Sequence, residues 1–230
     1  MGDPADVLLH KKWYEPFRDL IYVSPHTYAL RKLDHKILKH VTRRFGFFVE
    51  AGANDGIQQS NTLYFEKHRN WRGILIEPDP ALASRCRKTR IKSITVEAAL
   101  VAPADSGKTV SFTSMGLMGH VHGSFKTEGE AQSHVRSAGE CFQPSPKPIH
   151  VRGLTLTEIL VQHSVKKIDL LILDVEGYEA QALSGLEFAK YKPEFILVEA
   201  RYPDEIHAIL SDKYTLKDKL TERDWLYCLK

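Results

Sequence analysis

The chain has 230 residues, of which 43% are hydrophobic, and a formal net charge of +3 at pH 7, so we expect residues 1–230 to form a single domain with a full core. The small net charge argues against a nucleic-acid partner, and no apolar run is long enough to span a membrane. Three cysteines without a CxxC spacing, and a start without a hydrophobic signal region, indicate reduced thiols and a cytoplasmic location.

The first predicted element is an amphipathic helix over residues 28–44. Its apolar residues recur at helical intervals and would share one face: Leu30, Leu33, Ile37, Leu38 and Val41. We therefore expect residues 1–45 to form an N-terminal helical cover over a sheet.

Residues 47–56, FFVEAGANDG, are typical of a buried strand that ends in an acid and a glycine loop. Gly52 and Gly56 would let the backbone approach a ligand, and Ser60 or Asn61 would cap the next helix. Such strand ends bind nucleotide-like ligands in open α/β sheets. The glycines lack the GxGxxG spacing of dinucleotide sites, and Glu50 would repel phosphates but attract the ammonium group of S-adenosylmethionine.

A second acid, Glu77, ends the predicted strand 73–77, and its carboxylate would accept hydrogen bonds from both hydroxyls of a ribose. Ala98 and Ala99, in a third strand over residues 93–101, would lie beside an adenine ring. The predicted cofactor contacts are Glu50, Gly52, Asn54, Gly56, Asn61, Glu77, Pro78, Ala98 and Asp174.

Strands and helices alternate along the rest of the chain. Between the second and third strands we expect a helix over about residues 80–89, and the basic cluster from Arg85 to Lys92 there is typical of a solvated face. A second half begins at Leu154 with a helix and continues as a strand, a helix and a strand. After a helix ending near Ser211, strands 214–219 and 225–229 should pair as an antiparallel hairpin. This order predicts an α/β, doubly wound, mostly parallel sheet.

Residues 105–148 separate the two halves and differ in character. They are rich in glycine and proline and show one clear strand pattern, at residues 109–113. We interpret this segment as an irregular insertion that forms a lid or a wall of the substrate pocket. A surface loop without a role is the alternative.

The third chemical feature is LLILDVEGYEAQAL, in which an apolar strand delivers Asp174 to its end and Glu176 follows. Two close carboxylates can take different roles, because repulsion or burial raises one pKa enough to make a base. We predict that Asp174 or Glu176 removes a proton from the substrate, with His122 as the second candidate. Glu199 and Arg201 would lie at the pocket rim or form an ion pair. No ligand spacing indicates a dedicated metal site, although metal-assisted deprotonation stays open.

Taken together, GANDGIQQSNTLYFE, WRGILIEPDP, TLTEIL and IDLLILDVEGYEAQALSG resemble the FkbM-type family of class I S-adenosylmethionine-dependent methyltransferases. The resemblance covers roughly residues 46–200. It implies a seven-stranded Rossmann-like sheet with a reversed final strand and O-methylation of a hydroxyl on a sugar, polyketide or related small metabolite or glycan. It also implies that the cofactor loop is residues 50–56, the ribose acid is Glu77, and the acidic strand-end motif is Asp174, Glu176 and Gly177.

Other classes of protein remain as alternatives. A catalytically silent Rossmann-like binding domain would keep the fold but lose cofactor contacts, yet the acids and glycines of the motif are present. A nucleotide-dependent oxidoreductase would need a third loop glycine. A nucleic-acid amino-methyltransferase would need a polar-Pro-Pro-aromatic motif where this chain has DVEG.

Overall fold

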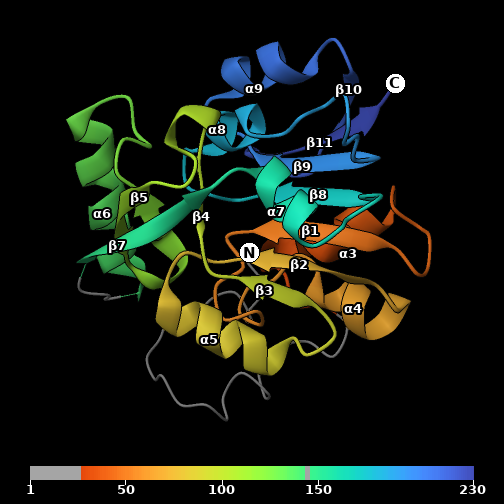
Figure 1. Ribbon diagram of the computed structural model, residues 1–230, viewed down its shortest axis with the longest axis horizontal. Helices are drawn as coiled ribbons and strands as arrows, with labels where there is room; N and C mark the ends of the chain where they lie inside the picture. Colours follow the sequence, from red (N-terminus) through yellow and green to blue (C-terminus); the bar gives the residue numbers. More distant parts are fainter. Residues whose placement is uncertain (1–26, 143–145) are drawn as a thin grey trace, which may run out of the picture.

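The structure is a computed structural model that describes residues 27–142 and 146–230. Its core is a seven-stranded sheet in the order β10-β11-β9-β8-β1-β2-β3 (Figure 1). Five strands are parallel: β1 (Phe47–Ala51), β2 (Arg72–Ile76), β3 (Ile94–Val96), β8 (Leu170–Leu173) and β9 (Phe195–Glu199). The strand β11 (Asp224–Leu229) runs antiparallel to both β9 and β10 (Tyr214–Lys219). The predicted doubly wound sheet with a reversed terminal strand is therefore confirmed.

Both faces of this sheet are buried under helices. Leu171 and Leu173 of β8 pack with α7 (Leu156–Gln162), α8 (Glu179–Ser184) and α9 (Pro203–Leu210). Leu170 and Ile172 point the other way and join the core formed with α3 (Leu33–Leu38), α4 (Leu63–Arg69) and α5 (Pro80–Thr89). The alternation follows from the two-residue period of a strand, and burial on both faces explains the continuous apolar run LLIL.

The N-terminal helix is shorter than predicted. A 3-10 turn, η1 (Leu30–Lys32), precedes α3, and Arg31 and Lys32 have positive φ angles of 52° and 57° that interrupt the helix. Helical backbone ends at Leu38, although Ile37 and Val41 are buried as expected. Of the predicted cover over residues 1–45, residues 1–26 lie outside the described part of the chain.

The predicted third strand, 93–101, is divided between two sheets. Its first part is β3, and its last part is β4 (Ala99–Leu100), which pairs with β7 (Lys147–Leu154). The division falls where β2 ends at Ile76, opposite Val96, and the Glu77 amide makes the last bond of this edge to the Val96 carbonyl.

The insertion is more regular than predicted. It contains a 3-10 turn, η2 (Pro103–Asp105), β5 (Thr109–Ser114), a second turn, η3 (Gly116–Met118), β6 (His120–Val121), α6 (Glu128–Phe142) and β7. The strands form a second sheet in the order β4-β7-β5-β6, which stands beside the large sheet (Figure 1). Sequence patterns missed α6 because EGEAQSHVRSAGECF has two glycines and few apolar residues, and they missed β7 because Pro148 falls within it.

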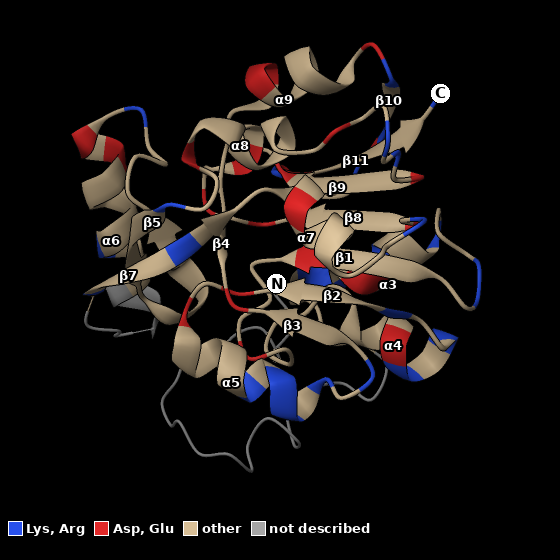
Figure 2. Cartoon of the chain, viewed as in Figure 1, with Lys and Arg blue, Asp and Glu red and all other residues tan. Residues whose placement is uncertain are grey.

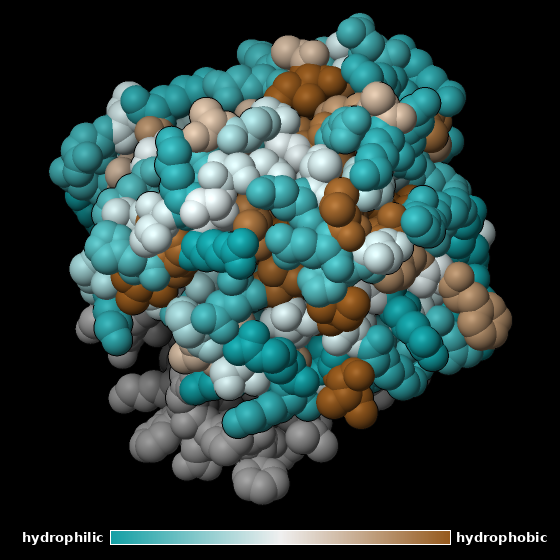
Figure 3. Space-filling view, in the orientation of Figure 1, coloured by the Kyte–Doolittle hydropathy of each residue, from teal (hydrophilic) through white to brown (hydrophobic). Residues whose placement is uncertain are grey.

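The surface of the described residues is mixed. On the face shown in Figure 3, hydrophobic residues lie in small separate groups among polar ones. Within the described ranges, none of the helices has the length and apolar character needed to cross a bilayer. Arg85, Arg87 and Lys88 of α5 are exposed as predicted. Figure 2 shows the basic positions along this helix. Cys86 and Cys228 are free thiols.

Arg90 is the exception in that basic cluster, because its side chain is completely buried. Its guanidinium donates to Glu66 Oε2 at 3.1 Å and lies 3.9 Å from Glu50 Oε2. It also donates to the Gly56 carbonyl and to the hydroxyls of two residues that precede α4, Ser60 and Thr62. The one cation therefore joins the end of α5 to the glycine loop and to α4.

We predict that Arg90→Met lowers the free energy of unfolding by about 3–5 kcal/mol, because Glu50 and Glu66 would stay buried without their cation. The matched control is Arg87→Met on the same helix, whose exposed ion pair with Glu97 should contribute less than about 1 kcal/mol. Urea denaturation of both variants measures the difference. Equal, small losses would show that Arg90 does not stabilise the loop.

Candidate functional site

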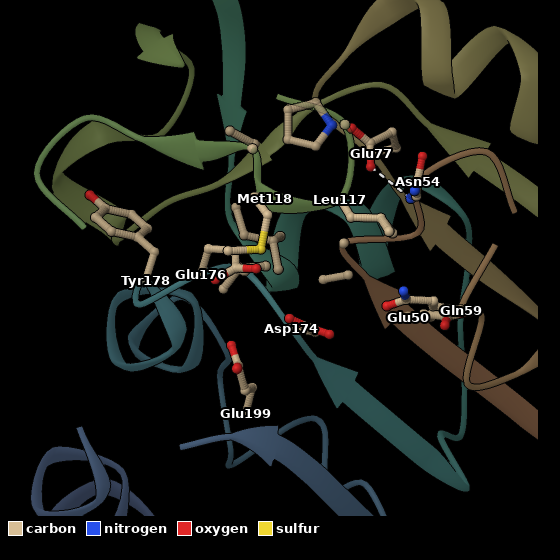
Figure 4. Close-up of a pocket in the computed structure, with 18 of the residues that line it drawn as sticks. Glu50, Asn54, Gln59, Glu77, Leu117, Met118, Asp174, Glu176, Tyr178 and Glu199 are labelled. Carbon is tan, nitrogen blue, oxygen red and sulfur yellow. Dashed lines mark hydrogen bonds between the residues drawn. The ribbon is translucent and has the colours of Figure 1, made fainter. Parts of the chain in front are cut away.

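A cavity of about 310 Å³ lies at the carboxyl edge of the large sheet (Figure 4). Loops that follow β1, β2 and β8 supply Gly52, Glu77 and Asp174, and Glu199 ends β9. Leu117 and Met118, from η3 of the insertion, line it as well. The strand ends place these groups together because parallel strands finish at one edge of a sheet.

Gly52 allows the ends of β1 and β8 to approach each other. Its φ is +82°, and a Cβ atom there would lie 1.9 Å from the Asp174 carbonyl oxygen. Its amide donates to the Ile76 carbonyl at 3.1 Å, which ties the same turn to β2. A glycine is required by both the backbone conformation and the space.

Glu77 is buried in the cavity wall with both carboxylate oxygens engaged. Oε2 accepts from the Asn54 amide at 2.8 Å, and Oε1 accepts from the Asp79 amide at 2.9 Å. Burial raises the pKa of Glu77 to about 7, against the opposing effect of the two amides. Each oxygen of a carboxylate has a second lone pair, so Glu77 can still accept from two ligand hydroxyls.

Glu50 lines the cavity, but its carboxylate binds protein groups. It accepts from the Asn61 amide at 2.8 Å and from the hydroxyls of Ser60 and Thr62. Its pKa is raised by burial, against the opposing charge of Arg90. Glu50 is two residues from Phe48, so it points to the same face of the sheet, toward α4 and α5. These oxygens thus already accept hydrogen bonds from the protein, and the contact of Glu50 with a ligand ammonium stays a prediction.

Asp174, Glu176 and Glu199 form a cluster in which one oxygen of each lies within 4.8 Å of the others. Burial, together with the charges of Glu199 and Glu176, raises the pKa of Asp174 well above its usual value. Burial and Glu199 raise the pKa of Glu176 to about 8, which Arg201 opposes. These carboxylates have the oxygen chemistry of a divalent-cation site, but an acidic cluster alone does not define one, and we assign no metal.

The three acids differ in their partners. Arg201 pairs with Glu176 at 3.1 Å, whereas Glu199 is 3.5 Å from Arg223. Of the two alternatives for Glu199 and Arg201, the ion pair between them therefore does not form, and Glu199 lines the cavity. No described residue donates a hydrogen bond to the carboxylate of Asp174.

The remaining predicted site residues divide between the cavity and its surroundings. Asn54, Asn61 and Pro78 line the cavity. Gly56, Ala98 and His122 do not. A Cβ at Gly56 would be 2.7 Å from Arg90 Cγ, so this glycine makes room for the buried arginine. Ala98 is buried, and its neighbour Ala99 is the one that faces the cavity.

His122 is exposed and bonds the Thr113 hydroxyl at 2.9 Å. The sequence left several lining residues unassigned, among them Gln58, Gln59 and Tyr178. Leu117 and Met118 are among the large apolar residues with which the insertion is expected to cover a substrate, and its fold brings them to the strand ends.

One family model matches most of the chain. It is described as the Methyltransferase FkbM domain and matches residues 50–216. A solved FkbM methyltransferase from Methylobacillus flagellatus KT has a TM-score of 0.51 and 13% identity to this chain, and the match covers 98% of this chain and 58% of that one. The chain thus spans less than two thirds of that protein's length. At this identity the likeness shows the fold.

Two other solved methyltransferases give lower scores. A TehB-like SAM-dependent methyltransferase from Corynebacterium glutamicum ATCC 13032 Kitasato has a TM-score of 0.44 and 10% identity, with 86% of this chain and 88% of that chain covered. An RNA methyltransferase from Salinibacter ruber, in complex with S-adenosyl-L-homocysteine, has a TM-score of 0.41 and 12% identity, with 86% and 90% covered. No curated protein matches the chain.

We predict that Gly52→Ala lowers the free energy of unfolding by about 3 kcal/mol or more, since a positive φ and an overlap with the Asp174 carbonyl both oppose the new methyl group. Gly107→Ala is the matched control, because Gly107 also has a positive φ, +74°, but a Cβ atom there would have no heavy atom within 4 Å. Its loss should be about 1 kcal/mol. Thermal and urea denaturation compare the two, and similar losses would refute the close approach at Gly52.

Proposed function

The chain belongs to the FkbM methyltransferase family, whose methyl donor is S-adenosylmethionine, and we propose that it methylates a hydroxyl of a sugar, polyketide or other small metabolite. The observation that carries this proposal is the Asp174 carboxylate, which lines the cavity without a hydrogen-bond donor from any described residue. A base that must accept a proton from a substrate needs such a free oxygen.

The residues of the cavity fit the donor. Its volume is within the range of small-molecule sites. Glu77 keeps acceptor capacity for ribose hydroxyls, and Gly52 removes the side chain that would separate the ligand from the strand ends. The carboxylates at the other end favour a ligand with positive charge, and S-adenosylmethionine has a sulfonium and an ammonium group.

The chain's own residues would align, shield and deprotonate the acceptor. The bound donor supplies a methyl group on a positively charged sulfur. As the hydroxyl oxygen forms its bond to the methyl carbon, the carbon–sulfur bond breaks with its electrons on sulfur, and a carboxylate at the end of β8 takes the hydroxyl proton. Asp174 and Glu176 are the candidates, and the exposed His122 is the weaker one.

The insertion would form the acceptor side of the cavity. Phe112, Leu117, Met118 and Val121 give that wall an apolar surface next to the carboxylates. A polyhydroxylated molecule with an apolar face would find both kinds of contact there, since carboxylates accept hydrogen bonds from hydroxyls. The two alternatives, a nucleotide-dependent oxidoreductase and a catalytically silent binding domain, have less support. The carboxylates would repel the phosphates of a dinucleotide, and a silent binding domain does not need an Asp174 carboxylate that lacks hydrogen-bond donors.

We predict that S-adenosylmethionine and S-adenosylhomocysteine bind at one site and that Glu77→Ala weakens this binding by about 1.5–3 kcal/mol, the scale of hydrogen bonds to a charged group. Glu97→Ala is the control, because Glu97 follows the neighbouring strand β3 but is exposed. Isothermal calorimetry measures both, with NADH as the competing ligand class. Unchanged affinity in folded Glu77→Ala would remove Glu77 from the site, and preferential binding of NADH would contradict the proposed function.

We also predict that Asp174→Asn lowers methyl transfer by about 10²–10⁴-fold, the usual loss on removal of a general base. Transfer is followed with tritium-labelled S-adenosylmethionine and a fractionated small-metabolite extract as the acceptor pool. Asp218→Asn, at an exposed position on β10, controls for the loss of one negative charge. Wild-type rates for both Asp174→Asn and Glu176→Gln would exclude the strand-end carboxylates as bases.

A further inference from the structure

The two acids of the DVEG motif lie in different surroundings, although one residue separates them. Arg201 Nη2 donates to Glu176 Oε2 at 3.1 Å, and His134 Nδ1 lies 3.7 Å from the same oxygen. The described residues offer no such donor to Asp174. Figure 4 shows both carboxylates near the strand end, with Glu199 below them. These two neighbours of Glu176 come from two other parts of the fold, the loop after β9 and helix α6 of the insertion.

Glycine at position 177 makes the approach of Arg201 possible. A Cβ atom on Gly177 would lie 3.1 Å from Arg201 Cδ and 3.0 Å from the Ser124 carbonyl oxygen, and the φ of Gly177 is +92°. On its other side, the Arg201 guanidinium lies 5.1 Å from the centre of the Phe125 ring. Arg201 is thus held between the loop after β8 and the insertion, in contact with both.

The hydrogen bonds of His134 define its tautomer. Nε2 is 2.9 Å from the Met118 carbonyl oxygen, which can only accept, so Nε2 carries the proton. Nδ1 then faces Arg201 Nη2 at 3.4 Å as an acceptor. Burial and the charge of Arg201 lower the pKa of His134. The charged or titratable groups near this ring are Glu176, Arg201, His120 and Arg223.

We propose that Arg201 is a positioning residue of the methyl-transfer site, which holds the Glu176 carboxyl group against the insertion and leaves Asp174 as the carboxylate that takes the proton. This inference rests on the proposed function. It assigns different roles to two acids that the sequence motif presents as equivalent. It also makes Arg201 the link between the insertion and the strand end, because one guanidinium contacts Glu176, His134 and Phe125.

The test is a pH titration of His134 by NMR in histidine-labelled protein, with the signal identified from His134→Gln. Arg201→Met should raise the pKa of His134 toward the ordinary value of a histidine, because a neighbouring cation that lowers it is removed. Arg201→Lys, which retains the charge, should keep the pKa closer to that of the wild type. Arg223→Met is the control and should have a smaller effect, since Arg223 is largely exposed and pairs with Glu199.

An unchanged His134 pKa in folded Arg201→Met would overturn the proposal. If that variant does not fold, Arg201→Gln decides, since it also removes the cation that lowers the pKa of His134, and an unchanged pKa in that variant would contradict the contact. In the tritium assay, Glu176→Gln should retain at least about tenfold more transfer than Asp174→Asn, whose loss is that of a base; equal losses would refute the division of roles. Calorimetry with S-adenosylhomocysteine distinguishes failure of this inference from failure of the proposed function. If the wild-type protein does not bind S-adenosylhomocysteine, the proposed function itself is contradicted.

Discussion

Carboxylates that are buried where parallel strands end must receive hydrogen bonds from the protein, and this requirement shapes the loops around the cavity. Glu50 binds the segment before α4, Glu77 binds one amide from each of two loops, and Glu179 accepts two amides of the loop after β8. Each acid therefore fixes the turn next to it. Asp174 lies among them without a described hydrogen-bond donor, and we base its proposed role as the base on this difference.

The insertion depends on the same strand ends. Its η3 turn lines the cavity with Leu117 and Met118, and its helix α6 reaches Arg201, the partner of Glu176, through His134. Arg201 completes that contact from the loop after β9. Gly177 has no side chain to block this meeting. The insertion and the acidic motif are thus one connected structure, so a change in the insertion can alter the position of a carboxylate that follows β8.

Much of the fold could be predicted because its signals are local. The LLIL run indicates a strand covered on both faces, and the order of strands and helices indicates a doubly wound sheet. The alternation of side chains along β1 also predicts the direction of Glu50. A residue two positions from Phe48 points to the same buried face of the sheet. The insertion was harder to predict, because glycines in α6 and a proline in β7 oppose the structures that tertiary contacts stabilise.

By itself, the sequence determined the sheet, the glycine loop, and the presence of Glu77 and Asp174 at strand ends, because strand periodicity and glycine conformation act over a few residues. Only the tertiary structure decided which of these carboxylates bind other groups of the protein. Arg90 is one basic residue among several in the sequence, yet it alone of that cluster turns inward to Glu50 and Glu66. Arg201 and His134 are 67 positions apart and meet at Glu176 through the packing of the insertion, which no local pattern encodes.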